Sequence, residues 1–339
     1  SPMDPNNLPS PIASVGPNIG SYDDSSVVGG NTYYYRVGVI KGGSEVIGEE
    51  QKLDAFDFVL AIGTDNGKVK KIDINGNEVW TFTGHTNKVT SVAVDSNGYV
   101  YSGSNDNTVK KINPDGNEVW SFSGHNSNIL DIAVDSSGNV YSGSQDNTVK
   151  KIDSLGNEVW TFSGHSSRVY GVAVDLNGYV YSGSRTVKLK KIDPDGNEVW
   201  TFSGHGDDIF GVAVDLNGYV YTVSADQTVR KTDPNGNEVW TFTGHSNRIY
   251  DVAVDSNGYV YSGGRYNDPS VRKIDPSGDG VWTFTGHSNT INSVVVDSLG
   301  NVYSGSDDNT VRKIDSDGNE VWKITQTSSV FGVGVYLNY

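Results

Sequence analysis

The chain has 339 residues, 35% of them apolar, and its 41 glycines stand among short runs of valine, tyrosine and threonine. This composition is sufficient for a full core and favours many short strands joined by tight turns. The net charge of -16 repels phosphate backbones and anionic lipids, which argues against nucleic acid as a partner. No apolar run reaches the roughly 18 to 20 residues of a membrane span, so no membrane insertion is expected. The lack of cysteine excludes disulfides and thiolate chemistry.

Residues 1–55 form a segment of their own. Tyr33 to Val39 alternates after a Gly-Gly-Asn turn and predicts a strand, with Ser44 to Gln51 as its partner across Lys41-Gly42-Gly43. The segment resembles the closing hairpin of a fibronectin type III domain, whose motif G-x-T-Y-x-Y-R-V implies that Tyr33 hydrogen-bonds a nearby backbone group. A whole domain of that type needs about 90 to 100 residues. The segment is therefore either a degenerate lobe or half of a domain completed by a longer precursor or a partner.

From residue 56 onward the chain repeats a unit of about 40 residues. In one copy, the run containing Val92 and Val94 and the runs 99–104, 108–112 and 117–122 read as four strands separated by turn residues. A glycine precedes every histidine, at His85, His125, His165, His205, His245 and His287. A tryptophan lies on each fourth strand, at Trp80, Trp120, Trp160, Trp200, Trp240, Trp282 and Trp322. Because so small a sheet cannot bury its own faces, the copies must stack, and such units repeated radially are the blades of a propeller.

The unit resembles the WD40 repeat, with Gly84-His85 at its start and Thr108 to Ile112 standing where that family reads T-V-K-L-W. It departs from the family at Ile112, which replaces the tryptophan of the third strand, while the tryptophan here lies on the fourth strand. Val134 to Tyr141 is also similar to the NHL repeat, another propeller family. The resemblance covers about residues 56–339 and implies a propeller over that range.

The number of strands predicts how the ring closes. The second, third and fourth strands occur seven times, but the Gly-His opening with its first strand occurs six times. Ser328 to Val335 repeats the pattern of Ser166 to Val174 with one residue deleted, so the C-terminus is expected to supply the missing strand. The predicted fold is therefore all-β: a seven-bladed propeller of four-stranded antiparallel blades over residues 56–339, closed by the C-terminal strand and preceded by a small β segment, residues 1–55.

The histidines are interpreted as structural. The WD40 resemblance implies that each Gly-His histidine bonds the aspartate between the second and third strands: His85 with Asp106, His125 with Asp146, His205 with Asp226, His245 with Asp268 and His287 with Asp308. Five copies argue for a structural role, because a catalytic site is needed once. The unit of His165 has lost this aspartate, so its rim is expected to be looser or remodelled. No nucleophile-elbow or phosphate-loop motif occurs, and we expect no catalytic residue, metal or cofactor.

The differences between copies indicate a binding face. The loop after each Gly-His and the turn between the second and third strands vary, and both belong to one rim of a propeller. Just inside this rim one strand position reads Thr90, Leu130, Tyr170, Phe210, Tyr250, Asn292 and Phe331. Aromatic residues and arginines are frequent in binding sites, so the candidate site comprises Arg168, Tyr170, Arg185, Phe210, Arg248, Tyr250, Arg265 and Tyr266. The alternative is that these aromatic side chains only pack between blades.

Three functions fit these patterns. The first is a non-enzymatic binding or structural propeller, resembling modules of phage and virus tail proteins, which recognises a host glycan, a receptor or an assembly partner within a larger homo- or hetero-oligomeric assembly, on a virion or an extracellular surface. The second is an intracellular WD40-type scaffold for protein partners. The third is a sugar-directed enzyme that uses Asp131 and Asp251 in the central funnel, although only these two acids occupy that ring position.

Overall fold

The computed structural model describes residues 32–35, 38–41, 44–47, 51–54 and 58–337. The chain divides into two compact units, Ser1–Phe56 and Asp57–Tyr339. In the first unit, β1 (Thr32–Tyr35) pairs antiparallel with β4 (Gln51–Asp54), and β2 (Gly38–Lys41) pairs antiparallel with β3 (Ser44–Ile47).

The N-terminal unit contains the expected antiparallel pairing. Gly38 lies opposite Ile47 in the pair of β2 with β3, and Tyr35 lies opposite Gln51 in the pair of β1 with β4. The paired segment extends to Asp54 instead of ending at Gln51. The interaction expected for the Tyr33 side chain lies outside the described residues.

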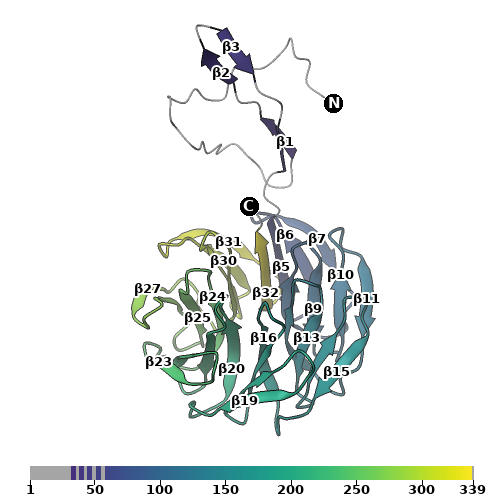
Figure 1. Ribbon diagram of the computed structural model, residues 1–339, viewed down its shortest axis with the longest axis vertical. Helices are drawn as coiled ribbons and strands as arrows, with labels where there is room; N and C mark the ends of the chain where they lie inside the picture. Colours follow the sequence, from purple (N-terminus) through teal and green to yellow (C-terminus); the bar gives the residue numbers. More distant parts are fainter. Residues whose placement is uncertain (1–31, 36–37, 42–43, 48–50, 55–57, 338–339) are drawn as a thin grey trace. The chain divides into compact units, whose positions relative to one another are not determined.

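Within residues 58–337, seven four-stranded antiparallel sheets form the blades of a propeller (Figure 1). The innermost strands of blades 1 to 7 are β32 (Val330–Leu337), β8 (Val89–Val94), β12 (Ile129–Val134), β16 (Val169–Val174), β20 (Ile209–Val214), β24 (Ile249–Val254) and β28 (Ile291–Val296). The second strands are β5 (Phe58–Thr64), β9 (Val100–Ser104), β13 (Val140–Ser144), β17 (Val180–Ser184), β21 (Val220–Ser224), β25 (Val260–Gly264) and β29 (Val302–Ser306). The third strands are β6 (Val69–Ile72), β10 (Val109–Ile112), β14 (Val149–Ile152), β18 (Leu189–Ile192), β22 (Val229–Thr232), β26 (Val271–Ile274) and β30 (Thr310–Ile314). The outermost strands are β7 (Glu78–Phe82), β11 (Glu118–Phe122), β15 (Glu158–Phe162), β19 (Glu198–Phe202), β23 (Glu238–Phe242), β27 (Gly280–Phe284) and β31 (Glu320–Thr325).

The turn between the first and second strands shows why the repeat reads Asp-x-x-Gly. In blade 2, Asp95 Oδ1 accepts hydrogen bonds from the backbone N–H groups of Asn97 and Tyr99, and Gly98 takes a positive φ of 76° that most residues avoid. The other oxygen, Oδ2, accepts the hydroxyl of the buried Tyr101 at 2.9 Å. One aspartate therefore closes the turn and satisfies a buried tyrosine at once, and the same Tyr to Asp bond recurs in blades 3 to 7.

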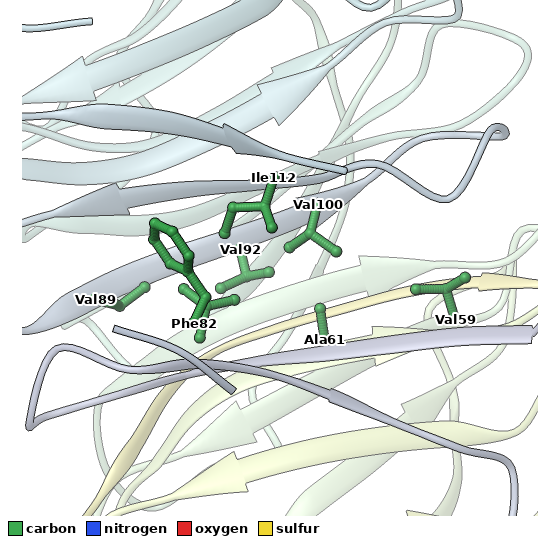
Figure 2. Close-up of a cluster of buried hydrophobic side chains, with 8 residues drawn as sticks. Val59, Ala61, Phe82, Val89, Val92, Val100 and Ile112 are labelled. Carbon is green, nitrogen blue, oxygen red and sulfur yellow. The ribbon is translucent and has the colours of Figure 1, made fainter. Parts of the chain in front are cut away.

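The hydrophobic core lies between blades and not within them. Figure 2 shows one cluster, in which Val59 and Ala61 of blade 1 meet Val89, Val92 and Val100 of blade 2. Equivalent clusters occupy each of the other junctions between neighbouring blades in the described part of the chain. A single blade would leave these side chains in water, so the copies fold only as a stack.

The tryptophan of each fourth strand connects its blade to the next one. Trp80 Nε1 donates a hydrogen bond to the carbonyl oxygen of Pro114 in the following blade, at 2.9 Å. The indole also lies against Gly116, where a Cβ atom would come within 3.0 Å of the ring, and φ at this glycine is 89°. Trp120, Trp160, Trp200, Trp240 and Trp282 make the same bond to the next blade. Trp322 completes the ring by donating to Ile74 of blade 1 at 3.2 Å.

The C-terminal strand closes the propeller, which confirms the predicted fold class and the predicted closure. In Figure 1 the yellow β32 lies beside the dark blue β5, and the two pair antiparallel from Val330 opposite Thr64 to Leu337 opposite Phe58. Val330 and Val333 lie in the core shared by blades 7 and 1. Among the described residues, no helix has the length and hydropathy that crossing a membrane requires.

We predict that deletion of residues 326–339 lowers the melting temperature and causes self-association, because it exposes the edge of β5 and the core around Val333. In the full-length chain, Val333→Asp should cost about 3 kcal/mol or more of unfolding free energy, because it buries a charge without a partner. Val321→Asp, on the outer strand at 53% exposure, is the control and should change stability by no more than about 0.5 kcal/mol. Thermal melts and light scattering of the three proteins test the closure, which is wrong if the truncated chain matches the parent in both.

Candidate functional site

The innermost strands share a β-bulge at one position. In blade 4 the register between β16 and β17 shifts between Val169 and Gly171, so Tyr170 is the additional residue of the bulge. A bulge turns a side chain out of the regular alternation and often does so beside a binding site. The bulge residues of the seven innermost strands, here called the funnel residues, are Thr90, Leu130, Tyr170, Phe210, Tyr250, Asn292 and Phe331.

All the funnel residues line one cavity of about 430 Å³ at the centre of the ring. Tyr170, Phe210 and Tyr250, from three successive blades, form a row with ring centroids 5.0 and 4.7 Å apart. The three rings thus pack against one another across the blade boundaries, and they also keep part of their surface exposed to the cavity. Packing and ligand contact, the two alternatives left by the sequence, are therefore compatible in this row.

The rim arginines are brought together in two pairs by the backbone. Arg185 N–H donates to the carbonyl of Arg168 in blade 4, and Arg265 N–H donates to the carbonyl of Arg248 in blade 6, both at 3.0 Å. The same backbone contact joins other residue types elsewhere: Lys88 with Asn105, Asn128 with Gln145, Asp208 with Ala225, Thr290 with Asp307, and Ser329 with Asp65. The fold thus fixes two backbone positions on the rim of each blade and leaves their side chains variable.

The predicted site residues lie in two layers. Tyr170, Phe210, Tyr250 and Arg265 line the cavity. Arg168, Arg185, Arg248 and Tyr266 do not line it; they lie on the rim loops and turns of the same blades. Arg265 lies over Tyr250 and Tyr266, with its guanidinium carbon 5.9 and 5.4 Å from the two ring centroids.

Two charged residues of the site were missed in the sequence. Lys88 lies over the ring of Phe331, with its Nζ 3.5 Å from the ring centroid, and lines the cavity. Asp208 stands between the arginine pairs; burial and the neighbouring Asp207 raise its pKa although Arg185, Arg248 and Arg168 act in the opposite direction. The signal for both was present, because Lys88 and Asp208 occupy the loop position of Arg168 in their own blades.

Each expected His to Asp pair is a hydrogen bond in the structure. His85 Nδ1 lies 2.8 Å from Asp106 Oδ2, and His85 Nε2 lies 2.8 Å from the hydroxyl of Ser102. Burial opposes the ionised form of Asp106, but hydrogen bonds from His85 and Thr108 outweigh it and hold the pKa of this carboxyl well below its usual range. The other pairs have His Nδ1 to Asp Oδ2 distances of 2.8 Å (His125 to Asp146), 2.9 Å (His205 to Asp226), 3.1 Å (His245 to Asp268) and 2.9 Å (His287 to Asp308). Both ring nitrogens are thus engaged in a contact that ties a loop to a turn.

Blade 4 lacks this contact, as its sequence indicated. His165 Nε2 lies 2.7 Å from the hydroxyl of Ser182, but Nδ1 is buried without a partner, and burial lowers the pKa of His165 to about 4. The neighbouring turn carries Val187 at a φ of 62°, where blades 2, 3 and 7 place asparagine and blade 5 places glutamine. A β-branched residue is strained in this region. The backbone of this turn keeps the hydrogen bonds of its counterparts, with Ser184 N–H to the Lys188 carbonyl and Val187 N–H to the Ser184 carbonyl each at 3.2 Å, so the expected remodelling is confined to the side chains. The turn also carries Arg185, one member of the arginine pair of this blade.

Asp131 and Asp251 join neighbouring innermost strands. Asp131 accepts hydrogen bonds from the Ser91 hydroxyl of the preceding blade at 2.7 Å and from the Val172 N–H of the following blade at 2.8 Å. Asp251 accepts the N–H groups of Val252 and Val294, each at 2.8 Å. Both residues keep some surface inside the channel, but protein surrounds the carboxylates, and burial raises the pKa of Asp131 to about 6 and that of Asp251 to about 7. Within the part of the chain that the structure describes, no three His, Asp or Glu side chains gather as metal ligands would.

We predict that restoring the repeat in blade 4 stabilises the protein. The variant Thr186→Asp, Val187→Asn, Lys188→Thr supplies the missing carboxylate to His165 and removes the strained valine, so the unfolding free energy should rise by about 1 to 3 kcal/mol. The matched control makes the reverse change in blade 3, Asp146→Thr, Asn147→Val, Thr148→Lys, and should lower it by a similar amount. Denaturant unfolding measures both, and equal stability of the blade 4 variant and the parent contradicts the interpretation.

We predict that Asp251 makes the propeller less stable as the pH rises. Its folded pKa of about 7 lies above the ordinary value of 3.8, so its stabilising contribution is complete below pH 3.8 and is lost as the pH rises through about 7. Asp251→Ser introduces the side chain that the equivalent positions carry as Ser91 and Ser293, where the hydroxyl accepts an N–H of the following blade. Between about pH 5 and about pH 8, unfolding free energy should fall more for the parent than for this variant. Parallel pH curves would contradict the raised pKa.

Comparisons with known proteins place the repeats in a family. A family model described as outer membrane protein assembly factor BamB matches residues 65–169 and 145–265. A model described as WD domain, G-beta repeat, matches residues 278–315, within the last two blades. No curated protein matches the chain. Because the two segments matched by the first model together cover more than half of the residues, the chain belongs to the β-propeller repeat family that this model describes, that of the outer membrane protein assembly factor BamB.

Proposed function

We propose that this protein is a non-enzymatic binding propeller that holds a partner, either a protein or a cell-surface glycan, on the rim and funnel of blades 4 to 6. The observation that carries the proposal is the separation of constant and variable positions. The Trp, Tyr and His contacts recur from blade to blade, while the funnel residue and the paired rim residues change. Residues that vary at fixed backbone positions around one cavity are the pattern of a binding face.

The engagement of the titratable groups supports a non-enzymatic role. The two channel carboxylates that a sugar-directed enzyme would need, Asp131 and Asp251, each accept hydrogen bonds that join neighbouring innermost strands. The histidines of blades 2, 3 and 5 to 7 have partners at both ring nitrogens. A general acid or base needs an atom that can reach a substrate proton, and these groups are committed to the fold instead.

The similarity to WD domain repeats and to an assembly factor favours a role in holding partners. Within that role, the resemblance of residues 1–55 and of the copied units to phage and virus tail modules favours a component of a tail or surface appendage. An intracellular scaffold that binds proteins through the same rim is the alternative, and it would use the same residues.

We predict that the variant Tyr170→Ala, Tyr250→Ala, Arg265→Ala folds but loses binding, because partly exposed rim residues contribute less to stability than the core does. The measurement screens the parent against an array of immobilised oligosaccharides and a displayed peptide library, and then compares the variant on every ligand recovered. We expect at least a tenfold loss of affinity.

The matched control changes three exposed residues of the conserved turns at the other end of the blades, Leu155→Ala, Leu176→Ala and Leu216→Ala. It should bind as the parent does. The proposal is wrong if the parent recovers no ligand from either collection, or if the rim variant binds every recovered ligand unchanged while remaining folded.

A further inference from the structure

The seven arginines among residues 58–337 fall into two groups. Three lie on the third strands of their blades, and each forms an ion pair with a carboxylate: Arg230 with Glu238, Arg272 with Asp268 and Arg312 with Glu320. By contrast, among the residues that the structure describes, no carboxylate lies within ion-pair distance of the four rim arginines, Arg168, Arg185, Arg248 and Arg265. The nearest compensation is Asp208, which interacts electrostatically with Arg185, Arg248 and Arg168 without forming an ion pair. In a chain with a net charge of -16, four rim arginines, three of which share one such carboxylate, need an explanation.

The backbone brings the two arginines of each pair together. The backbone contacts hold Arg168 beside Arg185 and Arg248 beside Arg265, although two like charges repel each other. The side chains are partly fixed in place: Gln145 accepts from Arg168 Nη2 at 2.8 Å in the amide orientation that satisfies both groups, and Arg265 lies over Tyr250 and Tyr266. A carboxylate placed at such a pair relieves the repulsion and receives charge-assisted, bidentate hydrogen bonds.

The cavity beside these pairs has two kinds of wall. Tyr170, Phe210 and Tyr250 form an aromatic row on one side, and Thr90 and Asn292 are polar funnel residues on other blades. The charged residues that also line the cavity are Lys88, Arg265, Asp131, Asp251 and Asp307. Its volume of about 430 Å³ lies within the range of small-ligand sites, roughly 300 to 1,000 Å³. A pyranose ring is amphipathic, because its C–H groups form apolar faces and its hydroxyls form a polar edge, so it can stack on the row and hydrogen-bond elsewhere.

Positive and negative side chains alternate around the rim, and this order bears on how acid groups would be spaced in an anionic ligand. The arginine pair of blade 4 is followed by Asp207 and Asp208 of blade 5, then by the arginine pair of blade 6, and then by Asp307 of blade 7. A densely charged polymer or an acidic peptide would place some of its charges against these aspartates. A ligand with single acid groups on otherwise neutral rings places fewer charges near these aspartates and meets less of that repulsion.

We propose that the ligand of this rim and funnel is an acidic saccharide, with a sugar ring on the row of Tyr170, Phe210 and Tyr250 and its carboxylate on an arginine pair. This inference rests on the proposed function and names the chemical class of the partner.

The test uses matched sugars that differ in one acid group. The full chain is titrated against immobilised sialyllactose and lactose, and against a glucuronic acid oligosaccharide and its carboxyl-reduced form. We expect affinity for at least one acidic member to exceed that for its neutral match by at least tenfold, and to fall between about 50 and about 300 mM salt. Arg185→Gln and Arg265→Gln, tested singly, should each lower affinity for the acidic sugar several-fold and leave the melting temperature near that of the parent. Lys323→Gln removes the same charge from an exposed position on the outer strand β31 and is the control, which should change neither.

The outcomes separate this inference from the proposed function. Equal binding of acidic and neutral sugars, or loss of affinity in the tyrosine variants without loss in the arginine variants, overturns the acidic class and leaves a binding rim. Recovery of peptide ligands alone, with no acidic sugar bound, also overturns the inference and favours a protein partner on the same rim. Absence of any rim-dependent ligand overturns the inference and the proposed function together.

Discussion

The hydrogen bond from one tryptophan to the next blade is the contact on which this ring depends. Each blade donates one indole N–H to a turn carbonyl of the following blade and accepts one from the preceding blade. Trp322 makes the same bond to Ile74 across the closure. A bond of this kind is worth only about 0.5 to 1.5 kcal/mol net, but it also sets the distance at which the valine and isoleucine side chains of two blades interdigitate. The tryptophan makes this contact from the outermost strand, whereas the WD40 repeat carries its tryptophan on the third strand.

One end of each blade makes the contacts that join it to the next blade, and the other end carries the variable rim side chains. At one end, the indole contacts and the Asp95-type turns recur with almost the same side chains, because the next blade must fit there. At the other end, the His to Asp contact fixes the backbone of the loop and the turn through groups set back from the rim. Side chains such as Arg168 and Arg185 can therefore differ between copies without changing the backbone contact that joins the loop to the turn. The fold separates stability from recognition by using opposite ends of one repeat.

Much of the fold could be predicted from the sequence because the chain repeats itself. The blade number and the closing strand could be predicted by aligning the copies with one another, and the five His to Asp pairs were implied by the resemblance to the WD40 repeat. Three features could not be predicted in this way. The bulge that turns Tyr170 into the funnel depends on hydrogen-bond register, the strain at Val187 depends on a dihedral angle, and the pairing of Arg168 with Arg185 depends on one backbone bond between residues far apart in the chain.

Blade 4 shows how far the rim of one blade can change while the fold is kept. It has lost the aspartate partner of His165 and holds Val187 at a positive φ, departures that each cost on the order of 1 to 3 kcal/mol. An isolated blade could not tolerate that cost, but here the core is completed on both sides by the neighbouring blades, and indole contacts join blade 4 to blades 3 and 5, so the ring shares the penalty. The turn that bears this strain also presents Arg185 beside Arg168. The turn of blade 6 also departs from the repeat, because Gly264 N–H bonds the Ser270 carbonyl across a longer turn, and it presents Arg265 beside Arg248. The two arginine pairs thus lie on turns that differ from the repeat.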